Sequence, residues 1–266
     1  MRRISLVLLV LVGASAACSS STTGAGAGKT ATAASSADVT VFAASSLTGA
    51  FTKIGADFQA AHPGTSVTFN FGPSDGLAGQ IESEGTADVF ASASATWMDD
   101  VSKKVGVSHQ TVFATNQLVI ITPPGNPAKI AGIADLAKPG VKLVLAAPGV
   151  PVGDYARQVL QNAGIGNAAE ANVVSNEPDD ASLVARIVSG EADAAIVYLS
   201  DVTSTVAPTV HSVPIPAAVN VIATYPIAVV NGSANATMAA AFLDYVAGPQ
   251  GQTTLATFGF LPAPKG

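Results

Sequence analysis

Short apolar runs rich in β-branched residues alternate with longer stretches of helical periodicity along most of the chain. The stretches after the first runs predict helices, one ending near Ala61 and others over Gly76–Glu84 and Ala95–Lys104. This alternation predicts an α/β fold of mainly parallel sheet flanked by helices. The predicted strands are Val39–Ala43, Ser66–Phe71, Asp88–Ala91, Val119–Thr122, Leu143–Ala146 and Ala194–Val197.

The number of predicted strands is larger than a single hydrophobic core would normally hold, yet no Gly/Ser-rich linker divides the chain between them. We therefore expect two lobes hinged by two strand crossovers, near Val119–Thr122 and Val221–Val230. Pro226, in the second crossover, suits an edge or a hinge better than a central strand. The expected first lobe comprises residues 38–118 and 224–266, and the expected second lobe comprises residues 119–223.

The first residues have the order of a secretory signal. Arg2 and Arg3 precede the apolar run Ile4–Val12, and small residues follow as far as Ala17. The apolar run is too short to span a bilayer, because a membrane-spanning helix needs about 20 residues. We expect residues 1–17 to be a signal peptide that directs the chain out of the cytoplasm.

Cys18 is the only cysteine, so the chain cannot form an intrachain disulfide. The sequence at 15–18, Ser-Ala-Ala-Cys, resembles the bacterial lipobox, although Ser15 stands where Leu is usual. We expect Cys18 to carry a lipid, and ordinary cleavage that leaves it as a spare thiol is the alternative. Residues 18–37 are almost wholly Ser, Thr, Ala and Gly after the cysteine, which predicts a flexible tether.

Composition and charge narrow the classes of function. Of the 266 residues, 48% are hydrophobic and 11% are charged, a balance typical of a folded protein. The net charge of −6, from 12 Lys and Arg against 18 Asp and Glu, argues against a nucleic-acid partner. The three histidines lie far apart in the sequence, which disfavours a zinc site.

Two serine-containing junctions between a strand and a helix predict an anion site. Ser46 follows the first predicted strand and Ser74 follows the second. Helix N-termini present free N–H donors and a partial positive charge. Ligands of parallel α/β sheets bind beyond the carboxyl ends of the strands, where both junctions fall. The simpler alternative is that Ser46 only caps a helix.

Residues 72–76 also match the Gly-x-Ser-x-Gly motif of serine hydrolases, with Ser74 as the nucleophile. The acid and the base of such an esterase would be Asp201 and His211. However, His211 lies in what reads as a short strand, and the chain has no HGGG-type oxyanion motif. We expect the protein not to be an enzyme, and the esterase stays as a remote alternative.

At these junctions the sequence resembles the periplasmic molybdate-binding proteins of ABC transporters. The matches follow the family's order and cover almost everything from Asp38 to Phe260. The resemblance implies a two-lobed periplasmic-binding-protein fold of type II. The matching segments are VFAASSLTGAF at 41–51, Phe71–Ile81, ADVFASA at 87–93 with Trp97–Asp99, Val150–Ala156, Gly190–Tyr198 and Phe242–Phe260.

The resemblance also implies a set of hydrogen-bond donors for a tetrahedral oxyanion. Two would come from the first lobe, by hydroxyl and backbone groups, and three from the second lobe. Tyr198 also has a simpler interpretation, as a buried tyrosine whose hydroxyl is satisfied elsewhere. The matched motifs contain no Lys or Arg at the ligand positions. The donors would be Ser46 and Ser74, then the backbone N–H of Val152, the backbone N–H of Asp180, and the phenol of Tyr198.

Asp180 departs from the family, which usually has Val at this position. A carboxylate beside a dianion is unfavourable unless it points away. Asp179 and Asp180 follow Pro178 and precede a helical pattern, so we expect an outward-facing side chain at a helix start. Two alternatives remain: Asp180 accepts a proton from hydrogen phosphate, or it alters the coordination of the anion.

The resemblance implies an extracytoplasmic solute-binding lipoprotein that captures molybdate or tungstate for the permease of an ABC transporter. The expected protein is a monomer without a cofactor, held to the outer face of the cytoplasmic membrane through its lipid. A sulfate- or phosphate-binding protein is the closer alternative. Phosphate would need a proton acceptor in the pocket, for which Asp75 and Asp180 are the candidates.

Overall fold

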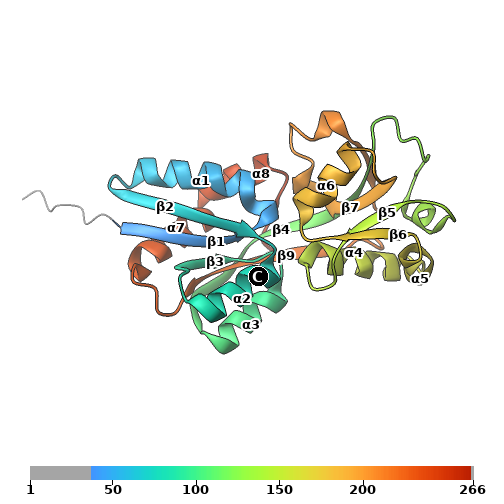
Figure 1. The fold of residues 1–266 in the computed structure, drawn as a ribbon. Coiled ribbons are helices and arrows are strands. Elements are labelled where there is room, and N and C mark those ends of the chain that lie inside the picture. Colours follow the sequence, from blue (N-terminus) through green and yellow to red (C-terminus); the bar gives the residue numbers. More distant parts are fainter. Residues whose placement is uncertain (1–36, 265–266) are drawn as a thin grey trace, which may run out of the picture. The chain divides into compact units, whose positions relative to one another are not determined.

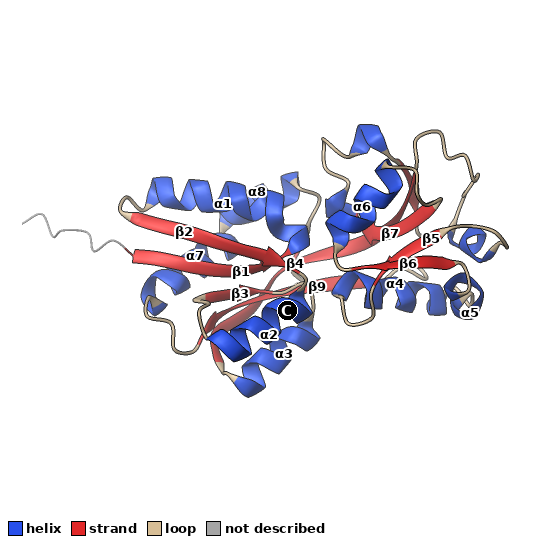
Figure 2. Cartoon of the chain, in the orientation of Figure 1, coloured by secondary structure: helices blue, strands red, loops and turns tan. Residues whose placement is uncertain are grey.

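The computed structural model describes residues 37–264, which form a ten-stranded sheet with helices on both faces (Figures 1 and 2). The predictions for the signal peptide, for Cys18 and for the tether up to residue 36 lie outside the described residues. The strands are β1 (Ala37–Ala44), β2 (Thr65–Gly72), β3 (Val89–Ala91), β4 (Val107–Thr122), β5 (Leu143–Ala146), β6 (Val173–Glu177), β7 (Ala194–Tyr198), β8 (His211–Pro214), β9 (Ile222–Val230) and β10 (Leu261–Pro262).

Eight α-helices and four short 3-10 turns connect the strands of the described part of the chain. The helices are α1 (Thr48–Ala61), α2 (Ser74–Glu84), α3 (Ala95–Lys104), α4 (Pro151–Asn162), α5 (Gly166–Glu170), α6 (Asp180–Val188), α7 (Ala236–Ala247) and α8 (Pro249–Thr257). The 3-10 turns are η1 (Ser45–Leu47), η2 (Ile133–Ala137), η3 (Leu199–Asp201) and η4 (Ala207–Thr209).

Two strands run through the middle of the sheet and join its two ends. The order of strands is β2-β1-β3-β9-β4-β7-β5-β6, with β8 and β10 paired to β4. β4 pairs with β9 from Val107 to Gln117, and with β7 and β8 from Leu118 to Thr122. We call β1–β3 with α1–α3, α7 and α8 the first lobe, and β5–β8 with α4–α6 the second lobe. The exact boundaries predicted above stay a prediction.

Each lobe has three parallel strands, β1–β3 in the first and β5–β7 in the second. The pairs that involve β4 and β9 are antiparallel. Parallel strands place their carboxyl ends at one edge of a sheet, and the helices that follow them begin at that edge. The α/β fold predicted from the sequence is therefore confirmed, and each lobe turns the starts of its helices toward the other.

All six predicted strands and the three predicted helices are present, and Leu143–Ala146 has the predicted bounds. β4 begins at Val107, well before the predicted Val119. The sequence did not reveal this earlier start, because most of the first seven residues of the strand are exposed and polar. β6 was not predicted from the sequence. Its side chains alternate between half-buried and exposed positions, with only Glu177 buried, so it lacks an apolar run.

Pro226 lies in an interior strand, so the expected edge position is wrong, whereas the hinge position stays a prediction. β9 stands between β3 and β4, and Pro226 pairs opposite Val112. The register with β4 shifts just beyond that pair. The Pro226 carbonyl accepts a 2.9 Å hydrogen bond from the Ser92 N–H on the other side. A residue without an N–H is accommodated here because the ladder is already irregular.

The first lobe is held by two apolar clusters, one on each face of its sheet. Phe51 of α1 contacts the rings of Phe113 and Phe242 at centroid distances of 5.7 and 6.1 Å. On the other face, Leu77 of α2 and Met98 of α3 are buried against the sheet. Burying one such side chain contributes about 1.5–3 kcal/mol. These clusters fix α1 and α2, whose first residues form part of the site described below.

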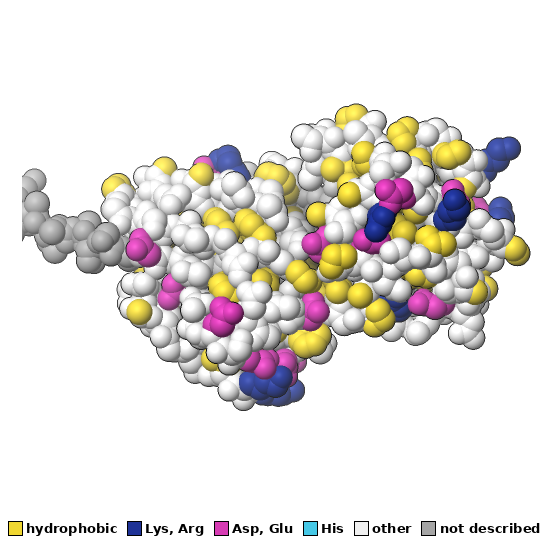
Figure 3. All heavy atoms as spheres, viewed as in Figure 1, with side chains coloured by type: hydrophobic (Ala, Val, Ile, Leu, Met, Phe, Trp, Pro, Cys, Tyr) yellow, Lys and Arg dark blue, Asp and Glu magenta, His cyan; other side chains and the backbone are white. Residues whose placement is uncertain are grey.

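Ion pairs between basic and acidic side chains lie on the surface of the described part of the chain. Lys104 lies 3.1 Å from Glu82 and 2.8 Å from Asp100, and Arg186 bonds Glu177 at 3.0 Å. Figure 3 shows several such mixed groups on a surface that is otherwise sparsely charged. Exposed ion pairs contribute about 0–1 kcal/mol each.

Among residues 37–264, no helix is long and apolar enough to cross a membrane.

Candidate functional site

The starts of four helical segments meet at one small cavity between the two lobes. These segments are η1 with α1, α2, α4 and α6, and each follows a strand or a short loop after a strand. First-turn N–H groups and helix dipoles make such a meeting point favourable for an anion. The cavity is small, with a volume of about 10 Å³, and is lined by Ala44, Ser45, Ser46, Pro73, Ser74, Ala93, Val150, Pro151, Asp180 and Tyr198.

Local sequence explains why α2 and α4 start where they do. Pro73 is extended (φ −65°, ψ 140°) and precedes α2, and Pro151 is the first residue of α4. A proline at a helix start loses no hydrogen bond and has the φ that the helix needs.

Gly153 lets α4 approach the end of β5 closely. A Cβ atom there would lie 2.7 Å from the Ala147 carbonyl oxygen and closer still to that of Ala146.

Ser74 is the first residue of α2 and is completely buried. Its Oγ accepts a 3.0 Å hydrogen bond from the Ala93 N–H. A hydroxyl that accepts one bond still has its own proton to donate. Since Ser74 lines the cavity, that proton is available to a ligand there.

Ser46 lies in η1 and is held by side chains from the two central strands. Its Oγ is 3.0 Å from the hydroxyl oxygen of Tyr225 on β9. The amide nitrogen of Asn116 on β4 reaches the same Tyr225 hydroxyl at 3.5 Å and the Ser200 hydroxyl at 2.8 Å. This network connects Ser46 to both crossover strands and to the second lobe. The alternative that Ser46 only caps a helix is wrong, because Ala44 and Leu47 are the N-cap residues of η1 and α1, and neither start has a side-chain cap.

Tyr198 is the last residue of β7, and its side chain is completely buried. Its hydroxyl oxygen is buried and has no hydrogen-bond partner among the described residues. The alternative of a hydroxyl satisfied within the core is therefore wrong. Burial raises the pKa of Tyr198 well above its ordinary value, so the phenol stays protonated. An unpaired, protonated hydroxyl on the cavity wall is a hydrogen-bond donor that lacks its acceptor.

Val152 is the second residue of α4, and its side chain is buried. Its N–H is one of the first-turn donors that have no acceptor inside the helix. Val150 and Pro151, the residues just before it, line the cavity. The structure therefore brings the start of α4 to Ser46, Ser74 and Tyr198.

Asp180 does not face outward, which corrects the sequence expectation. Asp179 is the residue that caps α6, since its carboxylate accepts a 2.8 Å hydrogen bond from the Ser182 N–H. Asp180 is the first residue of the helix, is 7% exposed and lines the cavity. Burial, together with the charge of Asp179, raises the pKa of Asp180 to about 7. The N–H and the hydroxyl of Ser46 act against this rise.

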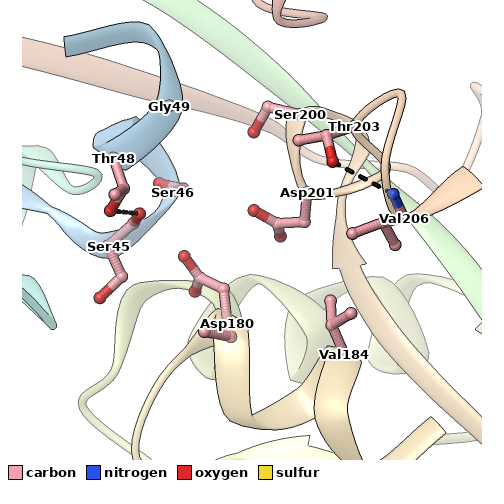
Figure 4. A pocket seen from close by; sticks show the side chains of 11 residues that line it. Ser45, Ser46, Thr48, Gly49, Asp180, Val184, Ser200, Asp201, Thr203 and Val206 are labelled. Atoms are coloured by element: carbon pink, nitrogen blue, oxygen red, sulfur yellow. Dashed lines mark hydrogen bonds between the residues drawn. The ribbon is translucent and has the colours of Figure 1, made fainter. Parts of the chain in front are cut away.

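A second, larger cavity adjoins the first and shares Ser45, Ser46 and Asp180 with it (Figure 4). It has a volume of about 230 Å³ and is also lined by Thr48, Gly49, Ala181, Val184, Ser200, Asp201, Thr203 and Val206. Burial and the nearby Asp180 raise the pKa of Asp201 well above its ordinary value. Neither cavity is lined by Lys, Arg or His. Any attraction for an anion must therefore come from neutral donors and helix starts.

Several residues around the site were missed by the sequence reasoning. Tyr225 and Asn116 lie inside strands and carry no motif, so only their spatial neighbours identify them. Trp97 of α3 donates from Nε1 to the Gly149 carbonyl at 2.8 Å, which connects the first lobe with the loop before α4. No spacing in the sequence signals this contact.

The residues required by the esterase alternative do not come together at the cavity. His211 is the first residue of β8, where it pairs opposite Thr122 and is exposed. It lines neither cavity, whereas Ser74 lines the small one. The strand predicted for His211 is confirmed. Asp75 is half-buried next to Ser74, and its Oδ1 has no partner among the described residues, but it does not line the small cavity.

Fold and cavity together define a binding protein of two lobes that hold a small ligand between them. The chain belongs to the family of bacterial extracellular solute-binding proteins, whose model matches residues 39–261. The periplasmic-binding-protein fold predicted from the sequence is confirmed by a solved structure, the periplasmic molybdate-binding protein of Azotobacter vinelandii. That protein aligns with a TM-score of 0.74 at 19% identity, over 85% of this chain and 100% of its own.

Two curated relatives are similar over most of their length. The molybdate-binding protein ModA of Mycobacterium tuberculosis H37Rv is 41% identical over 223 residues, which is 84% of each chain. The molybdate-binding protein ModA of Escherichia coli K12 is 33% identical over 241 residues, covering 84% of this chain and 88% of the relative. The family resemblance found in the sequence is therefore confirmed.

Proposed function

We propose that this protein captures molybdate or tungstate in the small cavity and delivers it to the permease of an ABC transporter. One observation carries the proposal: the Tyr198 hydroxyl is buried at the cavity without a partner, opposite serines at two helix starts. The names of the relatives support the choice of anion. We propose no catalytic activity, and the solute-binding family to which the chain belongs supports this.

The proposed donors come from both lobes. The hydroxyls of Ser46 and Ser74 and the phenol of Tyr198 would bond the oxyanion directly. The N–H groups of Val152 and Asp180, at the starts of α4 and α6, would complete the set. A dianion binds such neutral groups well in a dry site, because fixed dipoles lose little energy in reorganising.

Donors on both lobes imply that the ligand favours the closed arrangement, in which all of them reach it. We propose that residues 38–118 with 224–266 move against residues 119–223, with β4 and β9 as the connection. The Trp97–Gly149 hydrogen bond, 2.8 Å long, would be one of the contacts that form on closure.

Molybdate should raise the thermal stability of the purified protein. A ligand bound only by the folded state stabilises it by about 2.7 kcal/mol at a hundredfold excess over Kd. For a domain of this size that corresponds to a rise in Tm of about 5–10 °C. The rise in Tm is measured by thermal melts with molybdate, tungstate, sulfate and phosphate, each titrated over the same range of concentrations.

The four anions also separate the alternatives. We expect molybdate and tungstate to raise Tm at much lower concentrations than sulfate or phosphate do. A rise with phosphate or sulfate alone would contradict the proposed ligand and favour the other binding proteins. Release of nitrophenol from a nitrophenyl acetate that stops in Ser74→Ala would instead support the esterase.

We also propose that the mature protein is a monomer anchored to the outer face of the cytoplasmic membrane through a lipid on Cys18. The support is the lone cysteine at the end of a signal-like segment, followed by a polar stretch. We expect wild-type protein in the membrane fraction and Cys18→Ala in the soluble fraction, measured by immunoblotting of fractionated cells. Ser20→Ala serves as the control. Equal membrane association of Cys18→Ala and wild type would contradict the anchor.

A further inference from the structure

Asp180 is an acidic group on the wall of a site that we propose for an anion. It is 7% exposed and lines both cavities, the small one with Tyr198 and the larger one with Asp201. No Lys or Arg lines either cavity, so a carboxylate here has no basic partner within them. Burying an unpaired charge is costly, and a group in this position tends to become neutral.

The titratable groups that face Asp180 cannot stabilise its negative charge as cations would. They come from its own helix start, from η3, from the end of β7 and from within β9. Arg186, the one basic residue of α6, is held by Glu177 at 3.0 Å and by Glu191. The groups that face Asp180 are the carboxyls of Asp179 and Asp201 and the phenols of Tyr198 and Tyr225.

Once an oxyanion is bound, Asp180 lies beside the anion in the small cavity and beside a second carboxyl group in the larger one. Its carboxyl faces Ser46, whose hydroxyl is a donor that we propose for the anion. In the other direction lies the larger cavity, into which the Asp201 carboxyl also points (Figure 4). A charged Asp180 would therefore face the bound anion on one side and Asp201 on the other.

We propose that the oxyanion is captured together with one proton, which resides on the Asp180 carboxyl group. The neutral carboxyl presents an O–H donor to the anion in place of a second negative charge. This inference rests on the proposed function, because it concerns the same cavity. It makes Asp180 the residue through which the pH of the surroundings sets the affinity for the anion.

The direction of the pH effect follows from proton linkage. In the unliganded protein the pKa of Asp180 is about 7, and a bound dianion raises that pKa further because like charges disfavour ionisation. Below pH 7 the carboxyl is mostly protonated in both states, so affinity changes little. Above it, binding takes up a proton, and Kd rises by up to about tenfold per pH unit.

Calorimetric titration of the purified protein with sodium molybdate tests the proposal. Each titration is run at pH 6, 7, 8 and 9 in two buffers with different ionisation enthalpies, which gives the number of protons taken up. For the wild type we expect little change in Kd from pH 6 to 7, a steep rise above that, and an uptake that approaches one proton. For Asp180→Asn we expect a flat Kd and no uptake over the same range.

Asp179→Asn is the matched control. Asparagine caps a helix as well as aspartate does, so this variant should fold and still take up a proton on binding. The rise in Kd should begin at a lower pH than in the wild type, because the charge of Asp179 no longer raises the pKa of Asp180. A wild-type Kd that does not change from pH 6 to 9, or a pH dependence that survives in Asp180→Asn, would overturn the inference. If no protein binds molybdate at any pH, the proposed function fails instead.

Discussion

Tyr198→Phe is expected to weaken molybdate binding by about tenfold to a hundredfold, since a hydrogen bond to a charged group contributes roughly 1.5–3 kcal/mol. The Tm of the unliganded protein should stay unchanged or rise slightly. The reason is that the hydroxyl is buried without a partner, so removing it costs the empty protein no hydrogen bond. Calorimetric titration and thermal melts of the unliganded variant measure the two effects.

Tyr245→Phe is the control for this variant. Tyr245 is half-buried on α7, where its ring contacts Phe58 at a centroid distance of 5.5 Å, and it lines neither cavity. Its loss of a hydroxyl should leave the affinity for molybdate unchanged. If Tyr198→Phe binds as tightly as the wild type, Tyr198 is not a ligand. A large fall in the Tm of unliganded Tyr198→Phe would make it a structural core residue.

Gly153→Ala is expected to lower the stability of the protein by about 1–3 kcal/mol or more and to weaken molybdate binding as well. An added Cβ would meet the backbone carbonyls of Ala146 and Ala147, and backbone atoms cannot give way as a side-chain end can. The start of α4 would have to move away from β5, which displaces the Val152 N–H from the cavity. Chemical denaturation and titration with molybdate measure both losses.

Gly79→Ala is the matched control, because Gly79 lies within α2 and nothing stands within 4 Å of an added Cβ. Alanine favours helix over glycine by about 1 kcal/mol, so this variant should be as stable as the wild type or more so. Its binding should be unchanged. If Gly153→Ala is as stable and binds as well as Gly79→Ala does, α4 is not pressed against β5 in the way described.

Hydrophobic pattern was enough to predict the strands of the core, because their burial depends on apolar runs. Val39–Ala43 and Leu143–Ala146 are examples, both buried in the structure. It was not enough for the exposed first half of β4 or for β6, whose stability comes from pairing with neighbouring strands. Backbone pairing leaves no periodic signature in the side chains of an exposed strand.

For the site, helix-start signals and the family resemblance brought Ser46, Ser74 and Tyr198 to attention, and the structure places them around one cavity. Asp180 was expected to face outward, because capping rules describe the backbone of a helix start and not which side of it is covered. In the structure Asp179 caps the helix, and the carboxyl group of Asp180 is buried. α6 packs against η1 and η3, and this long-range packing, which covers the side of Asp180, is not visible in the local sequence.

The central claim, that an oxyanion binds between these helix starts, is tested most directly by a crystal structure with tungstate. Anomalous scattering locates the tungsten atom without reference to any assumed position. We predict one strong peak in the small cavity, surrounded by the hydroxyls of Ser46, Ser74 and Tyr198 and by the N–H of Val152. A fully occupied peak elsewhere, with this cavity filled only by water or side chains, would contradict the account.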